Sequence, residues 1–385
     1  MRAALIVPIF ASMVLAACGN STDSAAPKQE SPGTLVSQRS LDVADPALRA
    51  AASSATYIRY QSTSPAGRPI EVSGAVFLPT GHPPAGGWPV ITLGHGTSGV
   101  VSACGPTNSP TLFGSAPGVA EMLSGHHAVV MTNYQGLDGP GNAPYVDSLP
   151  SGYDMLNAVR AAYRTGLPLA ADTVIVGISQ GGRAGEAAAE TAKTYAPELK
   201  IHGVVLLSPA LSVHFVDAVH AGALHAPDQY LILPYLVEAV RYGNPGFGYD
   251  RVLHGDLLAA APRLESECTG QQTAADVALG TAATPAEASF ADDAAANTFS
   301  DFESRTDLPK TATTLPTYIA RGDSDVLVST AWSNDAVAKM CALDTPVHDL
   351  VVPGGHSAPG TVADQWLGWI QNLFSDKPFV STCRH

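Results

Sequence analysis

Short apolar runs separated by turn residues dominate the chain from about residue 55 onward. Most are rich in β-branched residues and bounded by Gly, Pro or polar clusters, which is typical of buried strands. Eight such strands are predicted, at 55–63, 70–78, 89–93, 128–132, 174–178, 203–207, 317–320 and 347–352. A Ser-Pro-Ala-Gly-Arg-Pro turn joins the first two, which predicts a hairpin.

Helical patterns fill the gaps between the later strands. The segment 154–164 places Met155, Ala158, Val159 and Ala162 on one face, and 182–195 is rich in alanine. Segments 333–342 and 362–374 continue the series. Strands that alternate with helices favour the α/β class, here a mostly parallel eight-stranded sheet with helices on both faces.

One long segment breaks this alternation. Between about residues 211 and 308 the strand signals vanish, and helical pieces replace them at 229–241, 250–264 and 274–280. We therefore expect a helical cap at 211–308, inserted into a core formed by 46–210 and 309–385.

The N-terminus has the features of an export signal. Arg2 precedes an apolar run over 3–15, which is too short to span a bilayer. The run ends in Leu-Ala-Ala-Cys, which resembles the lipobox of bacterial lipoproteins, where the Cys is acylated. Residues 1–18 are thus expected to be a signal peptide, Cys18 the lipid anchor in a bacterial cell envelope, and 19–45 a flexible tether. Ordinary secretion with a free Cys18 is the alternative.

Composition narrows the choice of partners. The formal net charge is −14 and no basic run occurs, so nucleic acid is not an expected partner. Apart from Cys18 there are four cysteines, Cys104, Cys268, Cys341 and Cys383, which in an exported protein predict two disulfides in any of three connectivities. Neither the cysteines nor the histidines have metal-ligand spacing, so we expect no metal and no cofactor.

The strongest chemical motif is Gly177-Ile178-Ser179-Gln180-Gly181. It follows a predicted strand and opens an alanine-rich helix, the strand–turn–helix setting in which a nucleophilic serine is held exposed. The small residues at 177 and 181 let the backbone double back there. The pattern predicts that Ser179 is a nucleophile rather than part of an ordinary turn.

A nucleophilic serine needs a base and an orienting carboxylate, in the chain order Ser, Asp or Glu, His. His356 follows a Pro-Gly-Gly loop directly after the last strand and is the expected base, whereas His348 starts a strand and His385 ends the chain. Asp323 and Asp325 both follow the seventh strand. We favour Asp325 as the triad acid, with Asp323 as a brace of the turn.

Backbone N–H groups should stabilise an oxyanion. One is the amide of Gln180, directly after the nucleophile. The other is expected in the loop Gly94-His95-Gly96-Thr97-Ser98-Gly99, with Thr97 as the donor. His95 in that loop is expected to be a buried histidine bonded to local backbone, and not a catalytic group.

These motifs together resemble the secretory lipase family, which includes fungal lipase A-type enzymes. The resemblance rests on His95-Gly96-Thr97 with Cys104-Gly105-Pro106, Asn133-Tyr134-Gln135-Gly136-Leu137, the segment 177–182, Gly322-Asp323-Ser324-Asp325 and Gly355-His356. It implies an α/β-hydrolase fold with a helical cap and a triad of Ser179, Asp325 and His356. It also implies a Cys104–Cys268 disulfide and, with that pair taken, Cys341–Cys383. The chain departs from the family at Asn133, where Asp is more usual, and in Asn142-Ala143-Pro144, where a His is common before the Pro.

Three functions are compatible with these residues. The leading hypothesis is an esterase or lipase that acts on small-molecule or lipid carboxylic esters; a peptidase or amidase with the same triad is the second. A non-catalytic surface lipoprotein that binds lipids is the third. The cap segment 230–237 is apolar and aromatic, which favours esters with apolar acyl groups.

Overall fold

The computed structural model describes residues 31–224, 226–375 and 377–383. The predicted signal peptide, Cys18, the first part of the tether and His385 lie outside these residues. No helix in the described ranges is both long and apolar enough to cross a bilayer.

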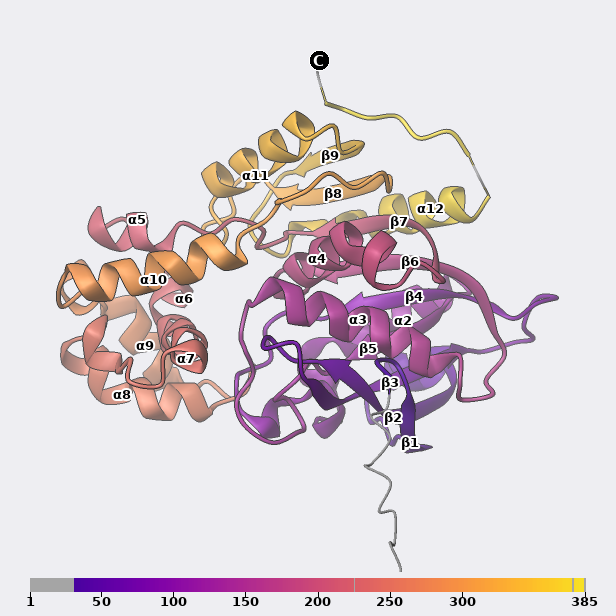
Figure 1. Ribbon diagram of the computed structural model, residues 1–385, viewed down its shortest axis with the longest axis horizontal. Helices are drawn as coiled ribbons and strands as arrows, with labels where there is room; N and C mark the ends of the chain where they lie inside the picture. Colours follow the sequence, from indigo (N-terminus) through magenta and orange to yellow (C-terminus); the bar gives the residue numbers. More distant parts are fainter. Residues whose placement is uncertain (1–30, 225, 376, 384–385) are drawn as a thin grey trace, which may run out of the picture.

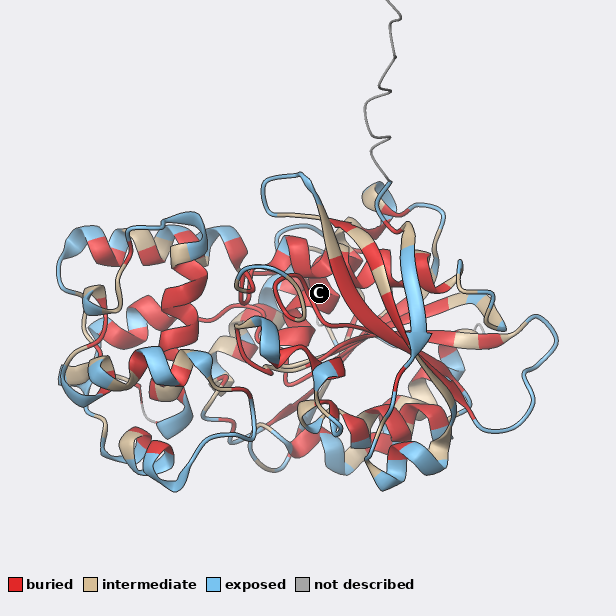
Figure 2. Cartoon of the chain, turned by 90° about the horizontal axis from the view of Figure 1, so that it is seen from below, coloured by how far each residue is buried: buried red, intermediate tan, exposed pale blue. Residues whose placement is uncertain are grey.

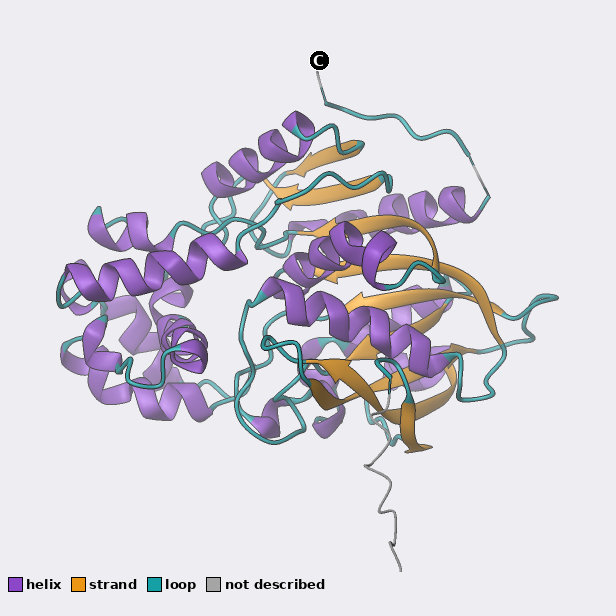
Figure 3. Cartoon of the chain, in the orientation of Figure 1, coloured by secondary structure: helices purple, strands orange, loops and turns teal. Residues whose placement is uncertain are grey.

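The core is a nine-stranded sheet in the order β1-β2-β3-β5-β4-β6-β7-β8-β9. The strands from β4 onward pair in parallel, and β1, β2 and β3 join antiparallel. This confirms the predicted α/β class and the mostly parallel sheet (Figure 3). The strands are β1 Leu35–Ser40, β2 Ala52–Thr63, β3 Pro69–Pro79, β4 Trp88–Gly94, β5 Ala128–Thr132, β6 Leu169–Ile178, β7 Lys200–Leu207, β8 Thr317–Gly322 and β9 Val347–Val352.

The prediction of eight strands was wrong by one, because β1 lies inside the segment expected to be tether. β1 pairs antiparallel with β2 at the sheet edge, and its side chains are mostly exposed. A solvated edge strand gains its stability from backbone hydrogen bonds on one side and needs no apolar run. Its sequence, Leu-Val-Ser-Gln-Arg-Ser, therefore carries almost no strand signal.

Helices cover both faces of the sheet (Figure 1). α1, α2 and α12 contribute to one apolar cluster with the sheet, and α3, α4 and α11 contribute to another. These helices are α1 Pro46–Ala51, α2 Ala116–Ser124, α3 Ser148–Ala162, α4 Gln180–Tyr195, α11 Thr330–Ala342 and α12 Ala363–Phe374.

Helices also fill the segment between β7 and β8, which forms a separate lobe beside the carboxyl ends of the strands (Figure 1). They are α5 Phe215–His220, α6 Pro227–Leu231, α7 Leu233–Gly243, α8 Gly255–Ser266, α9 Ala274–Ala282 and α10 Asp293–Thr306. This lobe, called the cap below, has its own apolar interior, seen as buried ribbon in Figure 2. Within the cap's described residues the one strand-like pairing is a bridge between Leu253 and Ala288.

The two ends of the cap are attached to the core through Arg183 of α4, which is 1% exposed. Its guanidinium donates to the carbonyl of Ala210 at 2.6 Å, where the cap begins, and to Thr306 Oγ1 at 3.2 Å, where it ends. It also pairs with Asp307 at 3.2 Å. One buried side chain therefore holds both ends of the insertion.

Two disulfides are present among the described residues, with the pairing that the family resemblance implied. Cys104–Cys268 joins the loop after β4 to the segment after α8, and so links the core to the middle of the cap. Cys341–Cys383 ties α11 to the C-terminal segment.

Candidate active site

Ser179 lies between β6 and α4 in a backbone conformation that non-glycine residues rarely adopt, with φ 55° and ψ −115°. The chain turns so sharply that a Cβ on Gly177 would lie 2.1 Å from the carbonyl oxygen of Gly181. A Cβ on Gly181 would lie 1.9 Å from the carbonyl oxygen of Gly94. Only glycine fits at these two positions, and the turn projects the serine beyond the end of the sheet.

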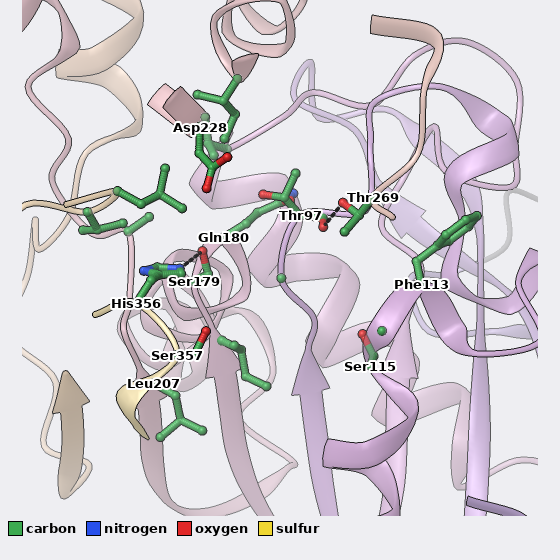
Figure 4. Close-up of a pocket in the computed structure, with 18 of the residues that line it drawn as sticks. Thr97, Phe113, Ser115, Ser179, Gln180, Leu207, Asp228, Thr269, His356 and Ser357 are labelled. Atoms are coloured by element: carbon green, nitrogen blue, oxygen red, sulfur yellow. Dashed lines mark hydrogen bonds between the residues drawn. The ribbon is translucent and has the colours of Figure 1, made fainter. Parts of the chain in front are cut away.

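The structure brings Ser179, His356 and Asp325 together. His356 Nε2 lies 2.9 Å from Ser179 Oγ, and His356 Nδ1 lies 2.7 Å from Asp325 Oδ2 (Figure 4 shows the Ser179–His356 contact). Asp325 is 5% exposed, and its Oδ1 accepts the N–H groups of Leu327 and Val328 at 3.0 and 3.1 Å. Those bonds fix the carboxylate and leave Oδ2 free to accept the Nδ1–H of His356.

Asp323 does not contact His356. Its Oδ1 accepts the N–H of Gly354 at 2.9 Å, so it braces the loop that carries the histidine. A second brace was not visible in the sequence: Ser208, at the end of β7, donates its hydroxyl to the carbonyl of His356 at 2.8 Å. The histidine loop is therefore held by side chains that follow two other strands of the sheet, β7 and β8.

Two backbone amides near Ser179 have no acceptor within the described parts of the chain, those of Gln180 and Thr97. Gln180 is 4% exposed, and nearly all buried N–H groups in proteins are paired. The loop that carries Thr97 passes close to the serine, since a Cβ on Gly96 would lie 3.9 Å from Ser179 Cβ. Two N–H groups that are free at this place match the arrangement of an oxyanion hole.

His95, in the same loop, is 1% exposed, and its Nδ1 lies 2.6 Å from the carbonyl oxygen of Gly96. Burial lowers the pKa of the imidazole to about 4, so it is neutral at physiological pH and donates from Nδ1. Its ring packs on the ring of Tyr134, with the two ring centroids 4.5 Å apart. These contacts agree with the expectation of a histidine bonded to local backbone.

A cavity of about 1000 Å³ opens over the serine, between the core and the cap (Figure 4). Ser179, Gln180, Thr97 and His356 line it, together with Trp366 and Phe113 from the core and apolar side chains from the cap. The cap's lining side chains include Val213, Phe215, Leu231, Ile232, Tyr235, Leu236 and Leu264. None of the described residues that line it is Lys or Arg, whereas Glu121, Asp228 and Glu267 are acidic.

The apolar segment 230–237 divides between this cavity and the cap interior. Leu231, Ile232, Tyr235 and Leu236 face the cavity, in pairs separated by about one helical turn. Tyr230 and Leu233 are 4% and 0% exposed, and they pack in the cap's own core. Tyr230 and Leu233 therefore belong to the cap's core, whereas Leu236 lines the cavity.

Two further residues near Ser179 gave no signal in the sequence. Tyr145 places its hydroxyl 2.8 Å from Thr97 Oγ1, and Thr269 of the cap donates its hydroxyl to the carbonyl of Thr97 at 2.6 Å. No group of three or more potential metal ligands occurs among the described residues.

Relatives of known structure share this architecture at low sequence identity. Candida antarctica lipase A superposes with a TM-score of 0.71 at 16% identity, over 92% of this chain and 84% of that one. The rice cell wall degrading esterase LipA of Xanthomonas oryzae, in a ligand-bound form, gives 0.69 at 20% identity, over 91% and 100%. At such identities the likeness establishes the fold.

Sequence comparison goes further. A protein of Mycobacterium tuberculosis (strain CDC 1551 / Oshkosh), named a probable inactive lipase, is 30% identical over 190 residues, which are 46% of this chain and 42% of the relative. The alignment thus spans less than half of that relative's length. The family profile described as secretory lipase matches residues 117–382, well over half of the chain. The chain belongs to the secretory lipase family.

Proposed function

We propose that this protein is an exported, lipid-anchored serine esterase that hydrolyses carboxylic esters through an acyl-enzyme on Ser179. The observation that carries the proposal is the continuous chain of contacts from Asp325 through His356 to Ser179, with distances of 2.7 and 2.9 Å. The serine end of this chain opens into a cavity lined largely by apolar side chains. Membership of the secretory lipase family supports the same reaction class.

In the proposed mechanism, Ser179 Oγ attacks the ester carbonyl while His356 Nε2 accepts its proton. Asp325 accepts the Nδ1–H of the imidazole, which keeps the tautomer that can receive that proton. The N–H groups of Gln180 and Thr97 bind the tetrahedral oxyanion. The alcohol leaves with the proton from His356, and a water molecule activated by the same imidazole then releases the acid.

The cavity favours esters with apolar acyl groups. Each methylene that moves from water into contact with Leu231, Tyr235 or Leu236 contributes about 0.8 kcal/mol. A peptidase commonly needs a charged group that holds a peptide terminus, and no Lys or Arg among the described residues lines the cavity. The lining therefore supports the esterase over the amidase.

Export and anchoring rest on the N-terminal sequence alone. The Leu-Ala-Ala-Cys segment after a short apolar run supports cleavage before Cys18 and acylation of that residue. Cys18→Ser should move the protein from the membrane fraction to the soluble fraction. Continued sedimentation of the variant with membranes would contradict lipid anchoring.

The decisive experiment compares the protein with its Ser179→Ala variant, without the N-terminal 30 residues, on p-nitrophenyl esters of graded acyl length and on matched anilides. We expect turnover of the esters, much weaker turnover of the anilides, and a loss of about 10⁶-fold in kcat for the variant. A fluorophosphonate should label Ser179 in the parent protein. If the parent neither turns over esters nor accepts the label, it is a non-catalytic relative; if anilides match the best ester, it is an amidase.

A further inference from the structure

The loop that carries Thr97 is held in place partly by the cap. Thr269 lies directly after Cys268, and its hydroxyl donates to the carbonyl of Thr97 at 2.6 Å, a contact drawn in Figure 4. Its own N–H donates to the carbonyl of Ser98 at 2.9 Å. A single cap residue thus binds two consecutive peptide groups of a core loop that passes the serine.

Other contacts fix the same loop from the core side. Tyr145, 2% exposed, places its hydroxyl 2.8 Å from Thr97 Oγ1. His95 Nδ1 holds the carbonyl of Gly96 at 2.6 Å. Because a trans peptide is planar, the bond to the carbonyl of Gly96 also sets the direction of the N–H of Thr97, which points the opposite way.

The disulfide keeps the cap segment close enough for these bonds. Cys104 and Cys268 have their Cα atoms 5.2 Å apart, and Gly99 packs so tightly that a Cβ there would lie 2.5 Å from Cys104 Sγ. Thr269 is therefore tethered next to the loop by a covalent bond one residue away. Thr269 is an exposed residue, so its replacement should cost little folding stability.

From this arrangement we infer that Thr269 is a positioning residue: by holding the carbonyls of Thr97 and Ser98 it fixes the backbone that follows Thr97, and so keeps in place the residue whose N–H binds the oxyanion. The inference rests on the proposed esterase function and extends it, because it gives the cap a part in the chemical step besides substrate binding. Thr269 makes no hydrogen bond to Ser179; its hydroxyl and its N–H both donate to the loop of Thr97. Its effect must therefore appear in the stability of the tetrahedral intermediate and not in the binding of the ester.

The test compares Thr269→Val, Thr269→Ser and a control, Thr281→Val. Valine keeps the shape and removes the hydroxyl, whereas serine restores the donor. Thr281 is a cap threonine on α9 whose hydroxyl bonds to the carbonyl of Val277 at 2.7 Å, away from the cavity. Each variant is assayed for kcat and KM on p-nitrophenyl butyrate, for Tm, and for inhibition by butylboronic acid, which forms a tetrahedral adduct on the serine.

For Thr269→Val we expect a loss of about tenfold in kcat, the value of one hydrogen bond, with KM within about twofold. The affinity for the boronic acid should fall by the same factor. Thr269→Ser and Thr281→Val should both behave like the parent protein. A parallel loss in Tyr145→Phe, which removes the other hydroxyl bonded to Thr97, would place both effects on the same loop.

Unchanged kcat and boronic acid affinity in Thr269→Val would overturn the inference, as would a change confined to Tm or KM. These outcomes are distinct from a failure of the proposed function. In that case the parent protein itself would lack ester turnover and would not bind the boronic acid, whatever residue stands at 269.

Discussion

Glu186 offers a sharp test of the electrostatics of the core. It lies on α4, seven residues after the serine, with 0% exposure, and neither carboxylate oxygen has a hydrogen-bond partner in the described part of the chain. Burial, and secondarily the charge of Glu190, raises its pKa from 4.5 to about 8. The carboxyl group is therefore neutral in the folded protein at pH values where it is ionised in the unfolded chain.

The direction in which stability changes with pH follows from that difference in pKa. Because the folded-state pKa is the higher one, the contribution of Glu186 to stability is fully present below pH 4.5 and is lost as pH rises towards 8. A pKa difference from 4.5 to about 8 corresponds to about 5 kcal/mol when the loss is complete. Between pH 5 and pH 8 the change is about 3–4 kcal/mol.

Glu186→Gln keeps the shape of the side chain and removes its titration. The free energy of unfolding, measured in urea with the disulfides intact, should shift in favour of the variant by about 3–4 kcal/mol as pH rises from 5 to 8. Any constant change in the free energy of unfolding that the new amide causes does not alter the pH dependence of the difference between variant and parent. A stability gap that is the same at both pH values would refute the reasoning.

Glu198→Gln is the matched control. Glu198 is on the surface, and its hydrogen bond to Arg160 lowers the pKa of the carboxyl group. The parent protein should therefore have the higher free energy of unfolding above the unfolded-state pKa of Glu198. This difference should disappear as pH falls through the folded-state pKa, so its pH dependence is opposite to that expected for Glu186.

Two further predictions concern the triad acid and the cap attachment. Asp325→Asn should lower kcat by about 10⁴-fold because the amide favours the wrong imidazole tautomer. Asp323→Asn keeps an acceptor for the N–H of Gly354 and should retain most activity. Equal losses of the two variants in ester assays would contradict Asp325 as the triad acid. Arg183→Met should lower the free energy of unfolding by about 1.5–3 kcal/mol, because it removes the hydrogen bonds of a buried guanidinium to Ala210 and Thr306 and leaves the partly exposed Asp307 without its cation. A shift below about 1 kcal/mol in urea melts would show that the guanidinium does not hold the cap ends.

The parts of the fold that the sequence predicted are those whose signal is local. β4, β5 and the second half of β6 are short runs between turn residues, and burial on both faces makes nearly every position in them apolar. β1 was not predicted because its stability comes from pairing with β2, and a pattern within six residues cannot reveal that pairing. α2 was not predicted for another reason: its first turn contains Pro117 and Gly118, residues typical of loops, although Pro is well tolerated in the first turn of a helix.

The residues of the candidate site also differ in how much local sequence signal they carry. Ser179 and His356 sit in motifs with their own local geometry, so they were identifiable from the chain alone. Asp323 and Asp325 are two residues apart on one turn, and only the direction of each side chain separates the brace from the histidine's partner. Thr269 lies 172 residues from Thr97, and nothing in its neighbourhood marks it beyond the adjacent cysteine.

The first turns of α4 relate Ser179 to the cap. Ser179 stands at the start of this helix, and a Cβ on Gly182 would lie 2.5 Å from Pro209 Cβ, so the chain that enters the cap packs directly on the helix. Arg183 follows immediately and holds both ends of the cap. Because the serine and the cap ends are fixed to the same short stretch of helix, and Cys268 fixes the middle of the cap to the loop of Thr97, the cap keeps a defined position over the serine. A hydroxyl on the cap can then hold the loop of Thr97 with the accuracy that the proposed oxyanion binding requires.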